Sequence, residues 1–283
     1  MKSGPILTRR QLGRGAVALA ALMSMPSGAF AQSGPVVIAS EDDVSTLDPH
    51  LIRNNHPIGS VVWSVFDSLV RRNADGTHEP RLALSWEQVE PTRWRFKLRD
   101  GVTFTNGEKF DAAAVKYNFE RMNISPFNGE SQLWPQTGLT AIEIVDPLTI
   151  DLVTSAPTVN MLYWLEEGFI GAPAYLKDTS PDVVGAKPIG SGPYVVTEWK
   201  QGDRVVLKAN PSHWNGEPAI KDVIFRDIPE LSSRINELKA GSVDIAVGLS
   251  PDTADEANSD KSKAVAVAGL RKMHMGISCN GIE

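Results

Sequence analysis

Hydrophobic side chains recur along parts of the chain every three or four positions, which is the spacing of an amphipathic helix. Residues 57–71 carry this spacing and are predicted to form one helix. A second helix is expected from the N-cap Asp111 to about Met122. A third is expected to end at Gly241, because glycine accepts the left-handed conformation that terminates helices.

Other stretches alternate apolar and polar residues, which predicts half-buried strands. The clearest covers residues 94–98, where apolar side chains alternate with arginine and lysine. Two hairpins are predicted, one joining 139–145 to 148–153 and one joining 194–200 to 204–209. Shorter strands are expected at 36–39, 243–247 and 271–283. Hairpins and helices in this irregular order favour a mixed α/β (α+β) fold over a regular doubly wound sheet.

The first 31 residues have the pattern of an export signal rather than of a folded segment. Four basic residues and no acidic one precede Ala31, and residues 15–25 form an apolar run too short to span a bilayer. Ala29-Phe30-Ala31 is a small-x-small cleavage site, and the stretch around Arg9-Arg10 is typical of a twin-arginine signal. An ordinary secretory signal with paired arginines is the alternative. We therefore expect periplasmic export, cleavage after Ala31 and no lipid anchor.

Charge and cysteine content narrow the function further. Removing the signal takes the formal net charge from −6 to about −10, which disfavours nucleic-acid binding. The single cysteine, Cys279, excludes a disulfide framework and a cysteine-based zinc module. No two of the five histidines have helical metal-ligand spacing, and all five are interpreted as surface side chains. The sequence indicates no metal site, no catalytic residues and no cofactor.

Three features of the sequence are candidates for a binding or catalytic role. Trp134 lies in a segment, 125–138, that reads as a loop; it either lines a site or pins the loop to the core. Glu166-Glu167 and Asp42-Asp43 are adjacent carboxylates, which more often form solvated surfaces than a hydrolase pair.

Six sequence blocks, in order, resemble the extracytoplasmic solute-binding proteins of family 5, which serve ABC importers of peptides, nickel complexes and related solutes. The blocks cover residues 45–50, 65–70, 82–86, 98–115, 189–194 and 238–246. The most specific is Leu98-Arg99-Asp100-Gly101-Val102, continuing through Asn106-Gly107. Gly101 and Gly107 are interpreted as turn residues, and Gly190 and Gly192 as suppliers of unusual φ values.

The resemblance implies a lobe like that of type II periplasmic binding proteins, with residues 32–283 forming an incomplete N-terminal lobe. Members of that family are considerably longer, so the second lobe is expected to be largely missing. It also implies a monomer that works with an inner-membrane ABC permease.

Three segments near the solute cleft follow from the resemblance: the loop 52–59, the stretch around Trp134, and the segment before Phe169. The candidate ligand-binding residues are Asn54, Asn55, His56, Trp134, Glu166 and Glu167. The acidic pair suits an amino group on the solute, so a peptide-like, opine-like or other amine-bearing molecule is expected. The alternatives are a non-functional remnant of such a protein, or an exported hydrolase.

Overall fold

The computed structural model describes residues 34–41, 43–52, 56–73, 75–129, 131, 133–249, 251–260 and 262–264. The predicted signal peptide and the strand expected over 271–283 lie outside these residues. None of the helices in the described ranges is long and apolar enough to cross a membrane.

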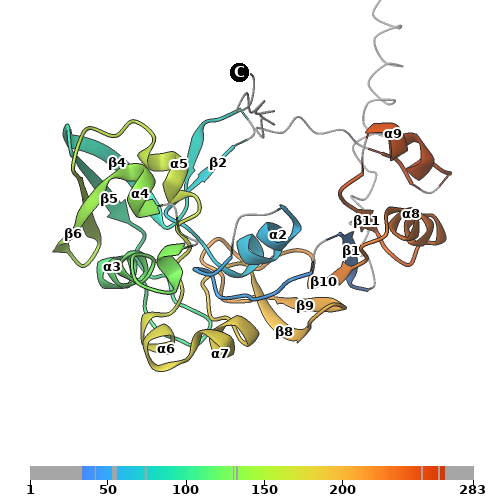
Figure 1. Ribbon diagram of the computed structural model, residues 1–283. Helices are drawn as coiled ribbons and strands as arrows, with labels where there is room; N and C mark the ends of the chain where they lie inside the picture. The colour runs from blue at the N-terminus through green and yellow to red at the C-terminus, as the bar shows by residue number, and fades with distance from the viewer. Residues whose placement is uncertain are drawn as a thin grey trace, which may run out of the picture. The chain divides into compact units, whose positions relative to one another are not determined.

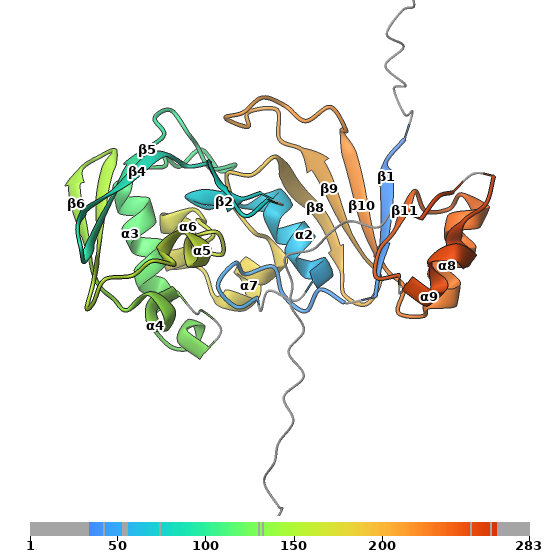
Figure 2. The same ribbon diagram turned by 90° about the horizontal axis from the view of Figure 1, so that it is seen from above.

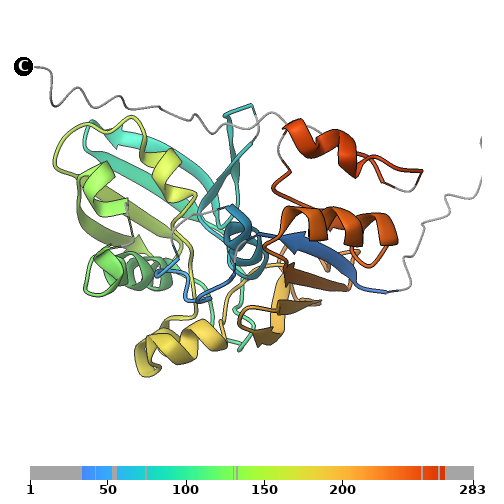
Figure 3. The same cartoon turned by 45° about the vertical axis from the view of Figure 1, so that its right-hand side comes forward.

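A five-stranded sheet joins the beginning of the described chain to its later part (Figures 1 and 2). Its strand order is β11–β1–β10–β9–β8. The strands are β1 (Val36–Ser40), β8 (Tyr194–Lys200), β9 (Arg204–Ala209), β10 (Asp222–Asp227) and β11 (Ile245–Ala246). β1 runs parallel to both of its neighbours, whereas β8, β9 and β10 form an antiparallel meander. Figure 3 shows the blue β1 beside the orange strands that follow it by more than 150 residues.

The two faces of this sheet are covered by different helices. Ile38 points toward α2 (His56–Val65), whose Val61 and Val62 pack with apolar residues of β9 and β10. Its neighbour Ala39 points the other way and packs with residues around α8 (Leu231–Ala240). This alternation is the period of two expected for a strand buried on both faces.

A second sheet of four antiparallel strands has the order β4–β5–β7–β6. The strands are β4 (Ala83–Glu90), β5 (Arg93–Leu98), β6 (Leu139–Asp146) and β7 (Thr149–Thr154). One face packs on α3 (Ala112–Arg121), with Phe119 of the helix and Phe96 and Ile150 of the sheet in one core.

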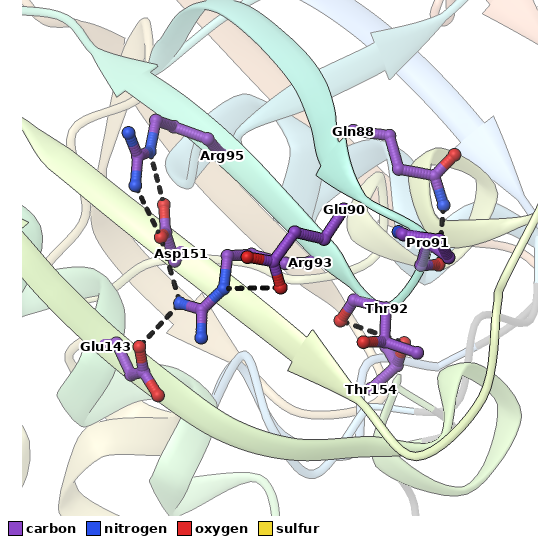
Figure 4. Close-up of polar contacts among 9 residues, drawn as sticks. All are labelled: Gln88, Glu90, Pro91, Thr92, Arg93, Arg95, Glu143, Asp151 and Thr154. Carbon is purple, nitrogen blue, oxygen red and sulfur yellow. Dashed lines mark hydrogen bonds and ion pairs between the residues drawn. The ribbon is translucent and has the colours of Figure 1, made fainter.

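The opposite face of the four-stranded sheet is a network of ion pairs (Figure 4). Asp151 accepts two hydrogen bonds from Arg95, both at 2.8 Å, and one from Arg93 at 3.0 Å. Arg93 also pairs with Glu143 on the edge strand β6 at 2.5 Å. The hydrogen bonds from Arg95 hold the pKa of Asp151 below its usual range. The charges on this face therefore largely satisfy one another.

Shorter elements join the two sheets. They are β2 (Val70–Arg72), β3 (His78–Pro80), the 3₁₀ turn Phe127–Gly129, α4 (Leu133–Thr137), α5 (Met161–Leu165), α6 (Pro173–Asp178) and α7 (Pro181–Ala186). The helix α9 (Pro251–Ala254) and the 3₁₀ turn Asp255–Ala257 follow β11. The mixed α/β class is thus confirmed.

Most predicted elements are confirmed, and two boundaries are wrong. Asp111 caps α3 through a 2.9 Å bond from the Ala114 amide, and Gly241 ends α8 with a φ of 78°. The first helix, however, ends at Val65 rather than at residue 71, because the Val65 carbonyl accepts from the amide of Gly192 at 2.9 Å. The strand expected over 243–247 is restricted to the two residues of β11 that pair with β1.

The reason given for two glycines is also wrong. Gly101 and Gly107 have the positive φ values expected of turn residues, whereas Gly190 and Gly192 do not. A Cβ on Gly190 would lie 2.1 Å from the Val65 carbonyl oxygen, and one on Gly192 would lie 2.5 Å from the Val65 carbonyl carbon. These glycines permit a close backbone approach to the end of α2 rather than an unusual φ.

Candidate solute-binding site

Glu166 lies directly after α5, as its C-cap residue, and faces the β2–β3 hairpin. Its carboxylate pairs with Arg72 of β2 at 2.8 Å, and its side chain is only 8% exposed against 26% for Arg72. Burial raises the pKa of Glu166 to about 6; the charge of Arg72 opposes this shift and that of Glu167 adds to it. Glu166 is therefore a desolvated carboxylate that already has a cationic partner.

The aromatic side chain of Tyr163 lies next to the Arg72–Glu166 pair. The guanidinium of Arg72 lies 4.6 Å from the centre of the Tyr163 ring, and Tyr163 makes an edge contact with Trp164. Tyr163 is 38% exposed, so one of its sides is open to solvent. Arg72 was not among the predicted site residues, because no local pattern connects residue 72 to residue 166. Glu167, the other predicted carboxylate, is half-buried.

Trp134 lies in the short helix α4 rather than in a loop, which corrects the interpretation of segment 125–138. Its indole nitrogen donates to the carbonyl of Phe119 at 2.6 Å, and its ring packs against the core beneath the four-stranded sheet. Trp134 thus pins this segment to α3. The hydroxyl of Thr158, shortly before α5, donates to the carbonyl of Thr137 at 2.7 Å and joins α4 to the α5 segment.

The remaining predicted residues are described only in part. Asn54 and Asn55 lie outside the described residues, and His56 is the first residue of α2, without a described side chain. The chain described just before them ends with the segment 43–52, which contains Asp48 and His50.

His50 is buried, at 3% exposure, which corrects its interpretation as a surface side chain. His213 is likewise buried, at 9%. His50 contacts Arg121, Asp48 and the carbonyl of Phe169, and this polar cluster lies between α3 and the segment that follows α5. The one available sequence signal was the block Asp48-Pro49-His50, which identified the family without indicating burial.

No three histidine, cysteine or acidic side chains lie close enough to hold a metal ion within the ranges that the structure describes. A shallow hollow lies between α2 and the β8–β9 hairpin, lined in part by Val61, Trp199 and Phe225. Neither Trp134 nor Glu166 lines it. The candidate site is therefore best defined by the Arg72–Glu166 pair and its aromatic neighbours.

Comparison with known proteins gives the family of this chain. Residues 77–281 match the bacterial extracellular solute-binding proteins, family 5 (Middle), so the chain belongs to that family.

Two curated relatives of this chain are periplasmic proteins of Escherichia coli (strain K12). The probable D,D-dipeptide-binding periplasmic protein DdpA is 30% identical over 243 residues, covering 82% of this chain and 46% of the relative. The nickel-binding periplasmic protein is 32% identical over 216 residues, covering 73% of this chain and 40% of the relative. The chain thus spans under half the length of the curated relatives it matches.

Among solved structures, the periplasmic binding protein DppA from Helicobacter pylori, in complex with the peptide STSA, superposes with a TM-score of 0.70. It is 25% identical, and the match covers 79% of this chain and 48% of DppA. Family members are solute-binding proteins rather than enzymes.

Proposed function

We propose that this chain is the substrate-binding component of an ABC importer, or a part of one, and captures a peptide-like, amine-bearing solute for delivery to a membrane permease. The observation that carries this proposal is the family match over residues 77–281. Relatives that bind a D,D-dipeptide or a peptide support the solute class. In this proposal the protein acts in the periplasm, after export by residues 1–31, and is not an enzyme.

The Arg72–Glu166 pair supports a zwitterionic solute over an anionic nickel chelate. In this proposal the ammonium group of the solute shares the buried carboxylate of Glu166 with Arg72, and a solute carboxylate approaches the partly exposed guanidinium of Arg72. The half-exposed ring of Tyr163 supplies apolar contact beside both charges. Asn54, Asn55, His56, Trp134 and Glu167 remain proposed contacts or supports of the same site.

The proposal is tested by calorimetric titration of the purified full chain with three probes: D-alanyl-D-alanine, the peptide Ser-Thr-Ser-Ala, and nickel with L-histidine. We expect only weak binding of a peptide probe, because one lobe offers about half of the contacts of a closed two-lobed cleft. The peptide should be recovered unchanged, and the nickel complex should give no heat of binding. Binding of the nickel complex alone would contradict the solute class. Cleavage of a peptide would instead favour an exported hydrolase.

The role of Glu166 is tested with Glu166→Gln, which removes the charge and keeps the shape. We expect the dissociation constant of the peptide to rise more than tenfold, equivalent to about 1.4 kcal/mol. N-acetylation of the peptide should abolish the difference between the two proteins, and Glu167→Gln is the matched control. Because the pKa of Glu166 is about 6, wild-type affinity should increase as the pH rises through that value.

A further inference from the structure

Arg121, near the end of α3, closes a buried polar cluster with two residues from the segment before α2. Its guanidinium donates to both carboxylate oxygens of Asp48, at 2.8 and 2.6 Å, and to Nδ1 of His50 at 2.7 Å. All three residues are at most 5% exposed. The His50 amide also donates to Asp48 at 3.0 Å, so the carboxylate is bound from two directions.

The partners of His50 fix its protonation state. A guanidinium can only donate, so Nδ1 accepts from Arg121; a carbonyl can only accept, so Nε2 carries the hydrogen that is donated to Phe169 at 3.0 Å. This neutral tautomer is consistent with its environment, because burial, followed by the charge of Arg121, lowers the pKa of His50 to about 4.

The cluster contacts two of the three segments that are proposed to meet the solute. In the chain, His50 lies two residues before the third segment, 52–59. Through Nε2 it holds the backbone of Phe169, three residues after Glu166. Through Arg121 it reaches the stretch that contains Trp134, because the guanidinium lies 3.6 Å from the centre of the Phe127 ring, which starts this stretch.

We propose that Asp48, His50 and Arg121 are positioning residues that hold two of these segments, the one before Phe169 and the one that contains Trp134, in one fixed arrangement. The inference rests on the proposed function only for the claim that these segments contact a solute. The hydrogen-bonded cluster of Asp48, His50 and Arg121, which we call the clamp, is present in the protein without solute. Hydrogen bonds with fixed donors and acceptors suit this role, because they specify one relative placement where an apolar contact would tolerate several.

The test compares His50→Gln with His50→Leu. A glutamine amide offers two N–H donors and an oxygen acceptor, so it can replace the one donor and one acceptor of the neutral imidazole, whereas leucine fills the space and offers neither. The control is Arg234→Met, which removes a buried arginine of α8 that donates to the carbonyls of Ile228 and Pro229, away from the three segments.

Amide hydrogen exchange of the full chain, without solute, is the first readout. We expect His50→Leu to speed exchange about tenfold in both 125–138 and 165–172, and His50→Gln to stay close to wild type. Arg234→Met should leave both segments unchanged. Unchanged exchange in His50→Leu, or equal acceleration by Arg234→Met, would overturn the clamp.

Titration with Ser-Thr-Ser-Ala is the second readout. We expect His50→Leu to bind the peptide more weakly than the wild type, and His50→Gln to bind it with close to wild-type affinity. Unchanged affinity despite faster exchange would overturn the positioning role while leaving the proposed function intact. If wild-type protein binds no peptide, the proposed function fails, and the exchange data still decide whether the clamp exists.

Discussion

The indole nitrogen of Trp214 donates to the carboxylate of Asp67 at 2.9 Å, although 147 positions separate the two residues. Arg81 and the hydroxyl of Ser191 donate to the same carboxylate at 2.9 and 3.0 Å. The guanidinium groups of Arg81 and Arg99 also lie 5.0 and 4.1 Å from the Trp214 ring centre. Asp67 is 1% exposed, so one buried carboxylate ties together segments that precede and follow the four-stranded sheet.

Replacing Asp67 by alanine should therefore destabilise the protein strongly. The substitution leaves the Trp214 donor and the Arg81 charge without their acceptor, and breaking a buried ion pair in this way costs about 3–5 kcal/mol. Urea unfolding followed by tryptophan fluorescence measures the loss. Asp203→Ala, which removes a half-exposed carboxylate paired with Lys200 and Arg204, is the control and should change the midpoint little. Equal effects of the two substitutions would refute the role of Asp67.

Gly190→Ala should be among the most damaging single changes at a glycine. Its new methyl group would overlap the Val65 carbonyl at the end of α2, and both partners are backbone that cannot move aside cheaply. We expect a loss of about 3 kcal/mol, the upper end for overpacking, with reduced yield of folded protein. Gly129→Ala is the control, because nothing lies within 4 Å of its Cβ position and its φ is not positive. Thermal unfolding of both variants provides the comparison.

Glu108 caps a helix from 66 positions away. Its carboxylate accepts from the amides of Ala174 and Tyr175, at 2.8 and 3.2 Å, in the first turn of α6. Glu108→Ala should lose about 1 kcal/mol, the usual value of a helix cap. Glu108→Gln should recover part of this, since an amide oxygen still accepts. A loss no greater than that of Glu217→Ala, whose carboxylate pairs with exposed Lys221, would contradict the capping role.

The buried His50 should make stability depend on pH in a defined window. Its pKa is lowered from 6.5 to about 4, so the unfolded chain binds a proton at His50 that the folded chain does not. The contribution of His50 to the free energy of unfolding is therefore fully present above pH 6.5. It is lost as the pH drops toward 4, by an amount on the order of 3 kcal/mol. His50→Gln should remove this part of the pH dependence. Parallel wild-type and variant profiles between pH 4 and 6.5, measured by urea unfolding, would show that His50 is not buried as described.

The export signal makes a prediction that concerns processing rather than structure. Expressed from its first residue in a Gram-negative host, the chain should appear in the periplasm with Gln32 as its N-terminus, which intact-mass measurement detects. Replacing both Arg9 and Arg10 by lysine should block export by the twin-arginine route. Undiminished export of that double variant would favour an ordinary secretory signal.

Local sequence determined the elements whose causes are local. The hairpin Tyr194–Lys200 to Arg204–Ala209 has the predicted bounds because strand alternation and turn residues lie next to one another in the chain. The ends of α3 and α8 also agree, since a cap acts within one helical turn. The ordered sequence blocks likewise sufficed for the family.

The tertiary structure alone decided what depends on distant partners. The end of α2 is set by Gly192, the environment of Glu166 by Arg72, and the burial of His50 by Arg121. Each of these contacts joins residues more than 70 positions apart: 71 for His50 and Arg121, and 94 for Arg72 and Glu166. Hydrophobic periodicity records which face of a segment is buried, but not which other segment buries it, because apolar packing is not directional. For that reason the sequence identified candidate segments, and only the fold showed which polar groups hold them together.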